Sequence, residues 1–447
     1  MPTPRRNMQL RSDRRREDSA LLPAAKRNYI VLSSFTFCFF FAQAMTMSLL
    51  SIWLTRKLGL NGVETGTVFS ANFIGAMCAQ PLYGFISDRM GMSRAVPIGI
   101  AALVLLAAPF FNFLYAPLLK SNLLIGAVIG GAYLGVTFIA GSYAIESFVD
   151  RVGRRERFEY SRVRLWGSMG YASAAAFSGQ LYNVDPSLNF YLASAAGLLL
   201  IPIMLLARQS PAPAAQAGAE RVSAADCFAI LRLPQFWGFM VLILGVTNLY
   251  LVYDQQFPFY FSSLFPTPAQ GSAMFGYLNS AQIFLEAGMM FLAPILVRRI
   301  GATRGLLLAS AIMIIRIGGS GLAIGPITIS ACKMLHSLEL PILVVSIFRY
   351  IAYHFEERLA STLYMVGVSF GHSLGVAVLS PIVGIGYDRI GFQHSYFVIA
   401  GVALLFWAIC WVVLRPTPAE SGRFRRESSP IAPEGLGDVV PTVAVSR

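Results

Sequence analysis

Charged side chains are scarce in this chain of 447 residues. Asp, Glu, Lys and Arg together make up 13% of the sequence, whereas 56% of the residues are hydrophobic. A soluble protein of this length needs polar faces on its helices, and uncharged runs of about 20 residues recur too often to leave room for them. Such runs are typical of polytopic membrane proteins. The composition therefore predicts an all-α membrane protein.

Motifs for covalent or nucleotide-driven chemistry are also lacking. The sequence has no phosphate-binding glycine loop with its Lys, no H-E-x-x-H and no nucleophile elbow. The five cysteines have no spacing that suits a metal or a disulfide. We expect neither an enzyme nor a resident metal or cofactor, so a proton gradient is the expected energy source.

The apolar runs predict twelve transmembrane helices, to within about four residues at each end. They lie at 29–54, 62–86, 95–117, 122–149, 163–182, 188–207, 236–262, 274–297, 306–325, 326–350, 359–383 and 393–414. The polar segment 208–235 is rich in Pro, Ala and Gly, as flexible linkers are. It divides the chain into a tail (1–28), two six-helix bundles (29–207 and 236–414) and a second tail (415–447). Both tails are expected to be disordered.

The net charge of +13 is unevenly distributed. Lys and Arg gather in the N-terminal tail, between spans four and five and between spans eight and nine, whereas the other side keeps few of them. This positive-inside pattern predicts that both termini lie in the cytoplasm. The charge therefore indicates a protein oriented in a lipid bilayer, and binding to nucleic acid is not needed to explain it.

Ionisable residues inside predicted spans are functional candidates. The C-terminal half has most of them, and the N-terminal half has two near the inner ends of spans four and five. They are Asp254, Glu286, Arg316, Lys333, His336, Glu339 and His372, with Glu146 and Arg164 in the N-terminal half.

Lys333, His336 and Glu339 recur at every third residue, which places them on one side of a single predicted helix. Asp254 can pair with Lys333, and Glu339 is then left in apolar company that favours its protonated form. Arg316 on the next helix can stabilise the anion when the protein changes state. The pattern predicts a carboxyl that binds and releases a proton. A set of static salt bridges is the alternative.

Glu146 and Arg164 are suited to a polyhydroxylated ligand, because carboxylate and guanidinium groups make several hydrogen bonds in fixed geometry. Tyr171 follows Arg164 by about two helical turns, so its ring can lie against a pyranose on the same face. The alternatives are one more positive-inside arginine for Arg164 and ordinary helix packing for Tyr171.

Two segments share the pattern G-x-x-x-D-R-x-G. GFISDRMG spans 84–91, after the second predicted helix, and GIGYDRIG spans 384–391, after the eleventh. The pair predicts an inverted internal repeat with its two loops on opposite sides of the membrane. A turn with a positive flank is the alternative.

With these residues placed, the chain resembles the major facilitator superfamily, and more narrowly the oligosaccharide:proton symporters that include lactose, raffinose and sucrose permeases. The resemblance covers about 28–415. Its motifs are SIWL (51–54), the loop motif at 84–91, ESFVDRVGRRERFEYSRVRLWGSMGY (146–171), DQQF (254–257), FGYLNSAQIFLEA (275–287), IIRIGGS (314–320), KMLHSLELP (333–341) and GIGYDRIGFQ (384–393). It implies a monomeric importer of sugar and protons in a bacterial-type inner membrane, working by alternating access.

The resemblance also implies roles for single residues. Sugar binding falls to Glu146, Arg164, Tyr171, Ser168, Glu286 and His336, proton coupling to Glu339, Arg316 and His336, a charge pair to Asp254 and Lys333, and gating to Gly84, Asp88, Arg89 and Gly91. Tyr171 stands where lactose permease has a stacking tryptophan, and Ser168 where it has a site cysteine.

Two departures distinguish the chain from lactose permease. A second Asp–Lys pair is replaced by Leu251 and His372, and an essential acid falls at Ile283 while Glu286 appears one turn along. The shift to Glu286, Tyr171 and the string GYLNSAQIFLEA match sucrose permease better, so sucrose is the favoured substrate. Lactose, melibiose, raffinose or another glycoside is the first alternative. Proton-driven efflux of sugars or drugs and a non-transporting sugar receptor are the others.

Overall fold

The computed structural model of the chain describes residues 4–90, 93–208, 232–355 and 368–414. The side chains of residues 4–24, Asp88 and Pro234 lie outside this description. The described residues form helices and contain no strand. Most of the predicted linker and the whole tail after residue 414 are outside the described residues.

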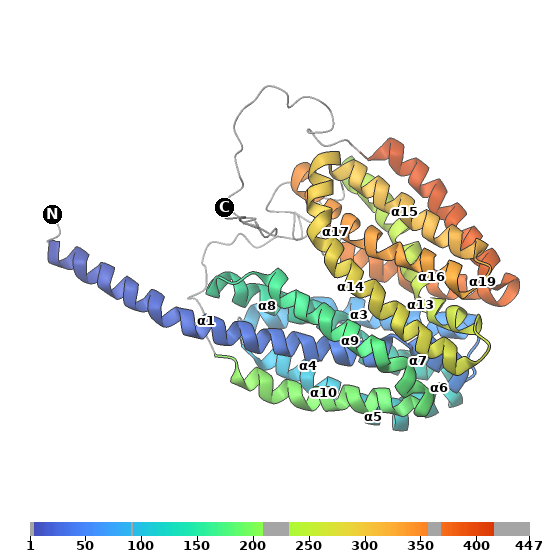
Figure 1. Cartoon of the computed structure of the whole chain (residues 1–447), viewed down its shortest axis with the longest axis horizontal. Helices are drawn as coiled ribbons and strands as arrows, with labels where there is room; N and C mark the ends of the chain where they lie inside the picture. The colour runs from blue at the N-terminus through green and yellow to red at the C-terminus, as the bar shows by residue number, and fades with distance from the viewer. Residues whose placement is uncertain (1–3, 91–92, 209–231, 356–367, 415–447) are drawn as a thin grey trace.

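The first half of the chain contributes the helices drawn from blue to green in Figure 1. They are α1 (Pro4–Met47), α2 (Leu50–Ile52), η1 (Trp53–Lys57), α3 (Gly62–Met90), α4 (Ala95–Leu105), α5 (Ala107–Pro109), η2 (Phe110–Tyr115), α6 (Ala116–Ser121), α7 (Leu123–Leu134), η3 (Gly135–Ala140), α8 (Gly141–Glu156), α9 (Tyr160–Val184) and α10 (Pro186–Leu206). Here η marks π-helical segments, which continue the α-helices next to them.

The second half contributes the yellow-green to red helices, which lie together on the other side of the molecule in Figure 1. They are α12 (Pro234–Leu242), η4 (Ile243–Thr247), α13 (Asn248–Ser263), α14 (Pro268–Ile300), α15 (Ala302–Leu322), α16 (Pro326–Met334), α17 (His336–His354) and α19 (Gly371–Val413).

The described residues supply the twelve predicted crossings. Eight helices are long and apolar enough to cross a bilayer, or nine if the bent pair Ala95–Leu105 and Ala107–Ser121 forms one span. α3 and α9 are 29 and 25 residues long, which is enough to span a bilayer. α19 contains two crossings, because Gly391 has φ 79° and interrupts its 43 residues. This confirms the all-α, twelve-helix architecture.

One expectation about the helices is wrong. The backbone of the N-terminal tail is helical from Pro4 onward, continuous with the first span, rather than disordered. Its Arg, Leu, Gln and Glu residues are good helix formers, which explains the difference. The predicted tenth helix, 326–350, is confirmed as one apolar span, Pro326–His354, with a local distortion at Leu335 between α16 and α17. Lys333 lies on α16, and His336 and Glu339 lie on α17.

Each half has its own apolar core. One buried cluster consists of residues from 31–207, and the other consists of residues from 236–414 together with Leu49 and Ile52. The first half packs tightly where α3 meets α7, because a Cβ on Gly75 would collide with the backbone of Gly131, and a Cβ on Gly131 would collide with the backbone of Ala71. Such close contacts between small residues are a common way to pack transmembrane helices.

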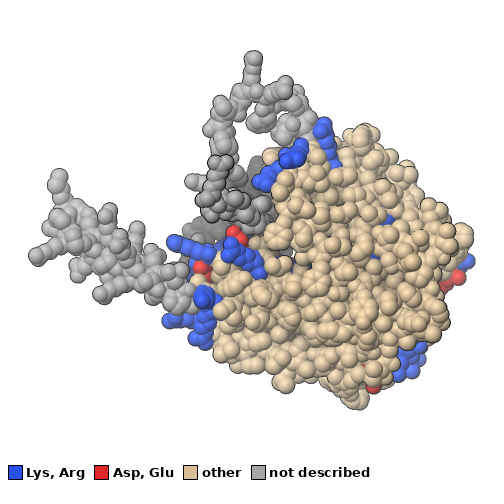
Figure 2. Space-filling view, in the orientation of Figure 1, with Lys and Arg blue, Asp and Glu red and all other residues tan. Residues whose placement is uncertain are grey.

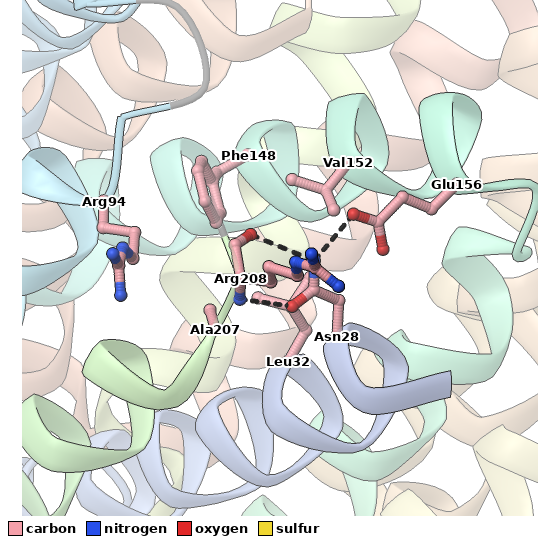
Figure 3. Close-up of a pocket in the computed structure, with 8 residues that line it drawn as sticks. All are labelled: Asn28, Leu32, Arg94, Phe148, Val152, Glu156, Ala207 and Arg208. Carbon is pink, nitrogen blue, oxygen red and sulfur yellow. Dashed lines mark hydrogen bonds between the residues drawn. The ribbon is translucent and has the colours of Figure 1, made fainter. Parts of the chain in front are cut away.

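The face of the molecule near Arg27, Arg94 and Arg208 is here called the N-terminal face. Asn28 joins three elements there: its amide donates to Glu156 Oε1 at 2.6 Å and to the Arg208 carbonyl at 3.2 Å, and its Oδ1 accepts from the Arg208 N–H at 2.7 Å (Figure 3). Figure 2 shows Lys and Arg gathered around this end and around the far end, with a broad and almost uncharged surface between them. That surface is suited to lipid.

The two halves meet at the far end, here called the opposite face. Arg56 of the first half donates to the Pro268 carbonyl at 3.0 Å and to Ser262 Oγ at 2.9 Å in the second half. The carboxylate of Asp388 accepts from the backbone N–H groups of Gly62 and Val63, at 2.7 and 2.8 Å, where α3 begins. These contacts close the molecule on the opposite face.

Candidate functional site

The centre of the site is an ion pair between α15 and α17. Arg316 Nε lies 3.0 Å from Glu339 Oε2, and Arg316 Nη2 lies 2.8 Å from Glu339 Oε1. The exposed fractions of the two side chains are 0% and 1%. Parallel hydrogen bonds of this kind fix both groups in one plane and stabilise the ionised carboxylate.

Asp254 on α13 lies on the other side of the guanidinium. Its carboxylate is 3.0 Å from Arg316 Nη1 and 2.6 Å from Lys333 Nζ. Two carboxylates, Asp254 and Glu339, and two cations, Arg316 and Lys333, thus balance each other. Because a buried charge without a partner is costly, this balance stabilises the state in which Glu339 has no proton.

The remaining members of the site follow the local distortion at Leu335. His336 and Glu339 occupy the first turn of α17, and His336 Nδ1 lies 2.8 Å from Glu339 Oε1. Glu339 is therefore in contact with Arg316 and His336. The expectation that apolar residues surround this carboxyl is wrong. The sequence could not show this, because it does not give the level of α15 relative to α17.

Aromatic rings surround the cations. The guanidinium carbon of Arg316 lies 4.8 Å from the ring centre of Tyr253 and 5.9 Å from that of Tyr250, and Lys333 Nζ lies 5.2 Å from that of Phe257. These contacts place the charged groups against α13 and provide favourable cation–π interactions.

The N-terminal half contributes a second ion pair. Arg164 Nε on α9 lies 2.8 Å from Glu146 Oε1 on α8, and Arg164 Nη1 donates to Ser168 Oγ at 3.1 Å. The guanidinium lies over the ring of Phe40, 4.3 Å from its centre. Both charged side chains are partly exposed, at 36% for Arg164 and 25% for Glu146, so a ligand could reach them.

Glu286 on α14 links the two sets of charges. It lies within electrostatic range of Arg164 from the first half and of His336 and Lys333 from the second half. Gln282, one turn before it, approaches its carboxylate at 3.4 Å. Tyr171 lies beside Asn279 and Glu286 at the same junction. The predicted sugar-binding residues of the two halves are therefore brought to one region.

A cavity of about 310 Å³ separates the halves between this region and the N-terminal face. Gln43, Ser142 and Tyr143 line it from the first half, and Tyr250, Ser369 and His372 line it from the second. Leu251 is also in its wall, and His372 Nε2 lies 2.9 Å from Thr247 Oγ1. The two residues that replace the second charge pair thus face the cavity.

The predicted gating motif is only partly described. Gly84 lies within α3, and Arg89 near its end has its guanidinium carbon 4.4 Å from the ring centre of Phe85. Gly91 and the side chain of Asp88 lie outside the described residues.

The sequence analysis did not predict several contacts of the site, nor those that join the two halves at the opposite face. Asp388 belongs to the repeated motif, but its partners are backbone groups of α3, which no sequence pattern specifies. Arg56 likewise binds a carbonyl and hydroxyls of another helix pair. Asn279, the neighbour of Tyr171, lies in the quoted string FGYLNSAQIFLEA and could have been found from it.

Comparison with known proteins identifies the family. The sequence model of the LacY proton/sugar symporter family matches residues 21–422. The chain belongs to this family. It is therefore a multi-pass membrane transporter whose family couples sugar to protons, and not an enzyme. In the described part of the chain, no group of three or more His, Cys, Asp and Glu residues could hold a metal.

Curated relatives and a solved structure agree with the family match. Raffinose permease of Escherichia coli is 39% identical, with 88% of this chain and 93% of the relative covered. Sucrose permease of Escherichia coli is 35% identical, with 86% of this chain and 93% of the relative covered. A crystal structure of the nucleoside transporter NupG has a TM-score of 0.76 at 13% identity, over 87% of this chain and 100% of that one, which shows the shared fold.

Overall identity does not separate the candidate sugars. Permeases named for raffinose, melibiose, lactose and sucrose all fall between 34% and 39% identity to this chain. The preference for sucrose that the sequence suggested is therefore still a prediction.

Proposed function

We propose that this protein imports a disaccharide or oligosaccharide together with a proton, with sucrose as the first candidate. The observation that carries the proposal is the position of Glu286, between the Glu146–Arg164 pair and the Arg316–Glu339–His336 cluster. A ligand that contacts Glu286 can reach charged groups of both halves, so its binding can be sensitive to the protonation of Glu339.

In this proposal, Glu146, Arg164, Ser168, Tyr171, Glu286 and His336 bind the sugar. Glu339 carries the proton, Arg316 promotes its release, and Asp254 with Lys333 forms a charge pair. The loop motif of Gly84, Asp88, Arg89 and Gly91 contributes to gating. The two bundles, 29–207 and 236–414, rock against each other with the sugar site between them.

His336 supports a direct link between the two ligands. An ionised Glu339 only accepts hydrogen bonds, so the 2.8 Å contact requires the proton on Nδ1, and neutral His336 then presents Nε2 as an acceptor. A protonated Glu339 can instead donate to Nδ1, which leaves Nε2 as a donor. The proton on Glu339 thereby sets which kind of sugar hydroxyl contact His336 can make.

The proposed orientation places both termini on the cytoplasmic side of a bacterial-type inner membrane, from the distribution of Lys and Arg. The cavity then faces the cytoplasm while Arg56 and Asp388 close the outer side. Such a state is the one expected after release of sugar and proton.

The test is sugar-induced proton uptake in energy-depleted cells or in vesicles. Sucrose, raffinose, melibiose, lactose and maltose are added one at a time, and alkalinisation of the medium is recorded. We expect alkalinisation with sucrose. A response to another sugar only would correct the substrate, and no response to any of them, with uptake present, would contradict proton symport.

A further inference from the structure

Four tyrosines lie between the charged site and the opposite face. Tyr253 and Tyr260 belong to α13, and Tyr387 and Tyr396 belong to α19. The ring centre of Tyr396 is 4.7 Å from that of Tyr253, 5.5 Å from that of Tyr260 and 5.9 Å from that of Tyr387. Tyr253 directly precedes Asp254 of the charged site, and Tyr387 directly precedes Asp388 of the opposite face. The cluster therefore extends from the charged site to the opposite face, where the two halves are in contact.

Two hydroxyl groups in this cluster have no hydrogen-bond partner within the described residues. They belong to Tyr387 and Tyr396, whose exposed fractions are 5% and 0%. An unpartnered buried hydroxyl costs about 1–3 kcal/mol, and native proteins rarely leave one without protein or water. Ordered water next to these two hydroxyls would satisfy them.

A third hydroxyl connects the cluster to the site. Tyr253 Oη lies 2.8 Å from Ser320 Oγ, and Ser320 Oγ donates its proton to the Arg316 carbonyl at 2.9 Å. Tyr253 must then be the donor to Ser320, which leaves its oxygen free to accept from the other side. Tyr387 and Tyr396 both lie within electrostatic range of Tyr253 and Asp254.

We propose that the hydroxyls of Tyr387, Tyr396 and Tyr253, with water between them, conduct protons between the opposite face and the Asp254–Arg316–Glu339 cluster. This rests on the proton symport of the proposed function. In each step a phenol oxygen accepts a proton from one neighbour and passes its own proton to the next, so every tyrosine ends neutral. The sugar, being far larger, cannot use this path.

The same geometry limits proton leakage. In the described state Arg316 occupies both oxygens of Glu339, so a proton arriving at Asp254 finds the carrier stabilised as an anion. Delivery to Glu339 requires Arg316 to move first. The relay therefore loads the carrier only in the other conformation of the transporter.

Replacing tyrosine by phenylalanine separates a relay from packing, because the ring stays and only the hydroxyl is lost. Tyr387→Phe and Tyr396→Phe are the test variants. Tyr115→Phe is the matched control: Tyr115 is 0% exposed and its hydroxyl also lacks a described partner, but it lies in the core of the first half.

Two rates are measured for each variant, with full-length protein in proteoliposomes. The substrate is the sugar that wild-type protein transports fastest among sucrose, raffinose, melibiose and lactose. One rate is influx driven by an imposed pH gradient, and the other is exchange at equal sugar on both sides, which needs no net proton turnover. We expect the two test variants to lower driven influx about tenfold and to keep exchange within about twofold, since a positioned proton-transfer group contributes at least that much. The control should keep both rates.

Unchanged driven influx in both test variants would overturn the relay, and so would an equal loss of influx and exchange, which indicates a packing role. In either case wild-type protein still moves protons with sugar, so the proposed function stands. If wild-type transport is insensitive to the pH gradient, the proposed symport and the relay fail together.

Discussion

Arg316 donates two parallel hydrogen bonds to Glu339, at 3.0 and 2.8 Å, in a part of the protein that is closed to solvent. A protonated Glu339 could not accept both bonds equally, and Arg316 would then have Asp254 alone as its anionic partner. In the proposed function, the described state corresponds to the empty carrier. Binding a proton must move Arg316 or weaken its contact, which ties the charge of one carboxyl to the arrangement of α15 and α17.

Glu339→Gln should abolish uphill sugar accumulation while sparing exchange. The amide has nearly the shape of a protonated carboxyl, so sugar still binds, but it has no proton to release to the N-terminal face. Accumulation under a pH gradient and exchange at equal sugar are measured in the same vesicles. Glu159→Gln, which removes a carboxylate from a surface pair with Arg162, is the control. Equal loss of both activities would assign Glu339 a structural role.

Glu146→Ala should lower sugar affinity at least about tenfold, because a hydrogen bond to a charged group contributes about 1.5–3 kcal/mol. Arg164→Lys should also weaken binding, since lysine keeps the charge but not the planar set of donors. Sugar binding is measured by the change in intrinsic tryptophan fluorescence or by calorimetry. Asp150→Ala, on the same helix and in a surface pair with Arg154, is the matched control. Unchanged affinity in both site variants would remove this pair from the site.

The sequence predicts the helices well because the bilayer imposes a simple rule: an apolar run long enough to cross it becomes a helix. The same reasoning finds Asp254, Arg316, Lys333 and Glu339, because charge inside such a run is rare. It does not predict the local distortion at Leu335 between α16 and α17.

Contacts between the halves are also beyond the sequence. The carboxylate of Asp388 binds backbone N–H groups that every residue but proline carries, so no residue type marks its partner. The absence of a Cβ at Gly62 gives this carboxylate room, because a Cβ would lie 2.7 Å from Asp388 Oδ1. This relation becomes visible only when α3 and α19 are placed side by side.

Asp388→Asn should favour opening of the opposite face. A carboxylate at an exposed helix N-terminus contributes about 0.3–1 kcal/mol, which corresponds to about a two- to fivefold shift between closed and open states. The distance between spin labels at Lys57 and Gln270, both exposed, reports this shift in a cysteine-free background. High salt should reduce the difference from the unsubstituted protein, because it screens exposed charges.

Arg389→Gln is the control for the opening of this face, since it changes a neighbouring exposed charge and leaves the Asp388 carboxylate in place. It should leave the distance distribution as it is. An Asp388→Asn protein that is as closed as the control would show that packing alone holds this face shut.

Asp254→Asn should destabilise the protein more than Asp254→Asn combined with Lys333→Met. The single change leaves Arg316 and Lys333 with only Glu339 as a described anionic partner, and a buried charge without its partner costs about 3–5 kcal/mol. The double change restores the balance. Thermal unfolding of purified protein in detergent measures the order, with Asp150→Asn and Asp150→Asn/Arg154→Met as the exposed counterpart. Equal unfolding midpoints for the single and double variants at the buried pair would show that Lys333 without Asp254 does not destabilise the protein. The predicted charge balance between Asp254 and Lys333 would then be contradicted.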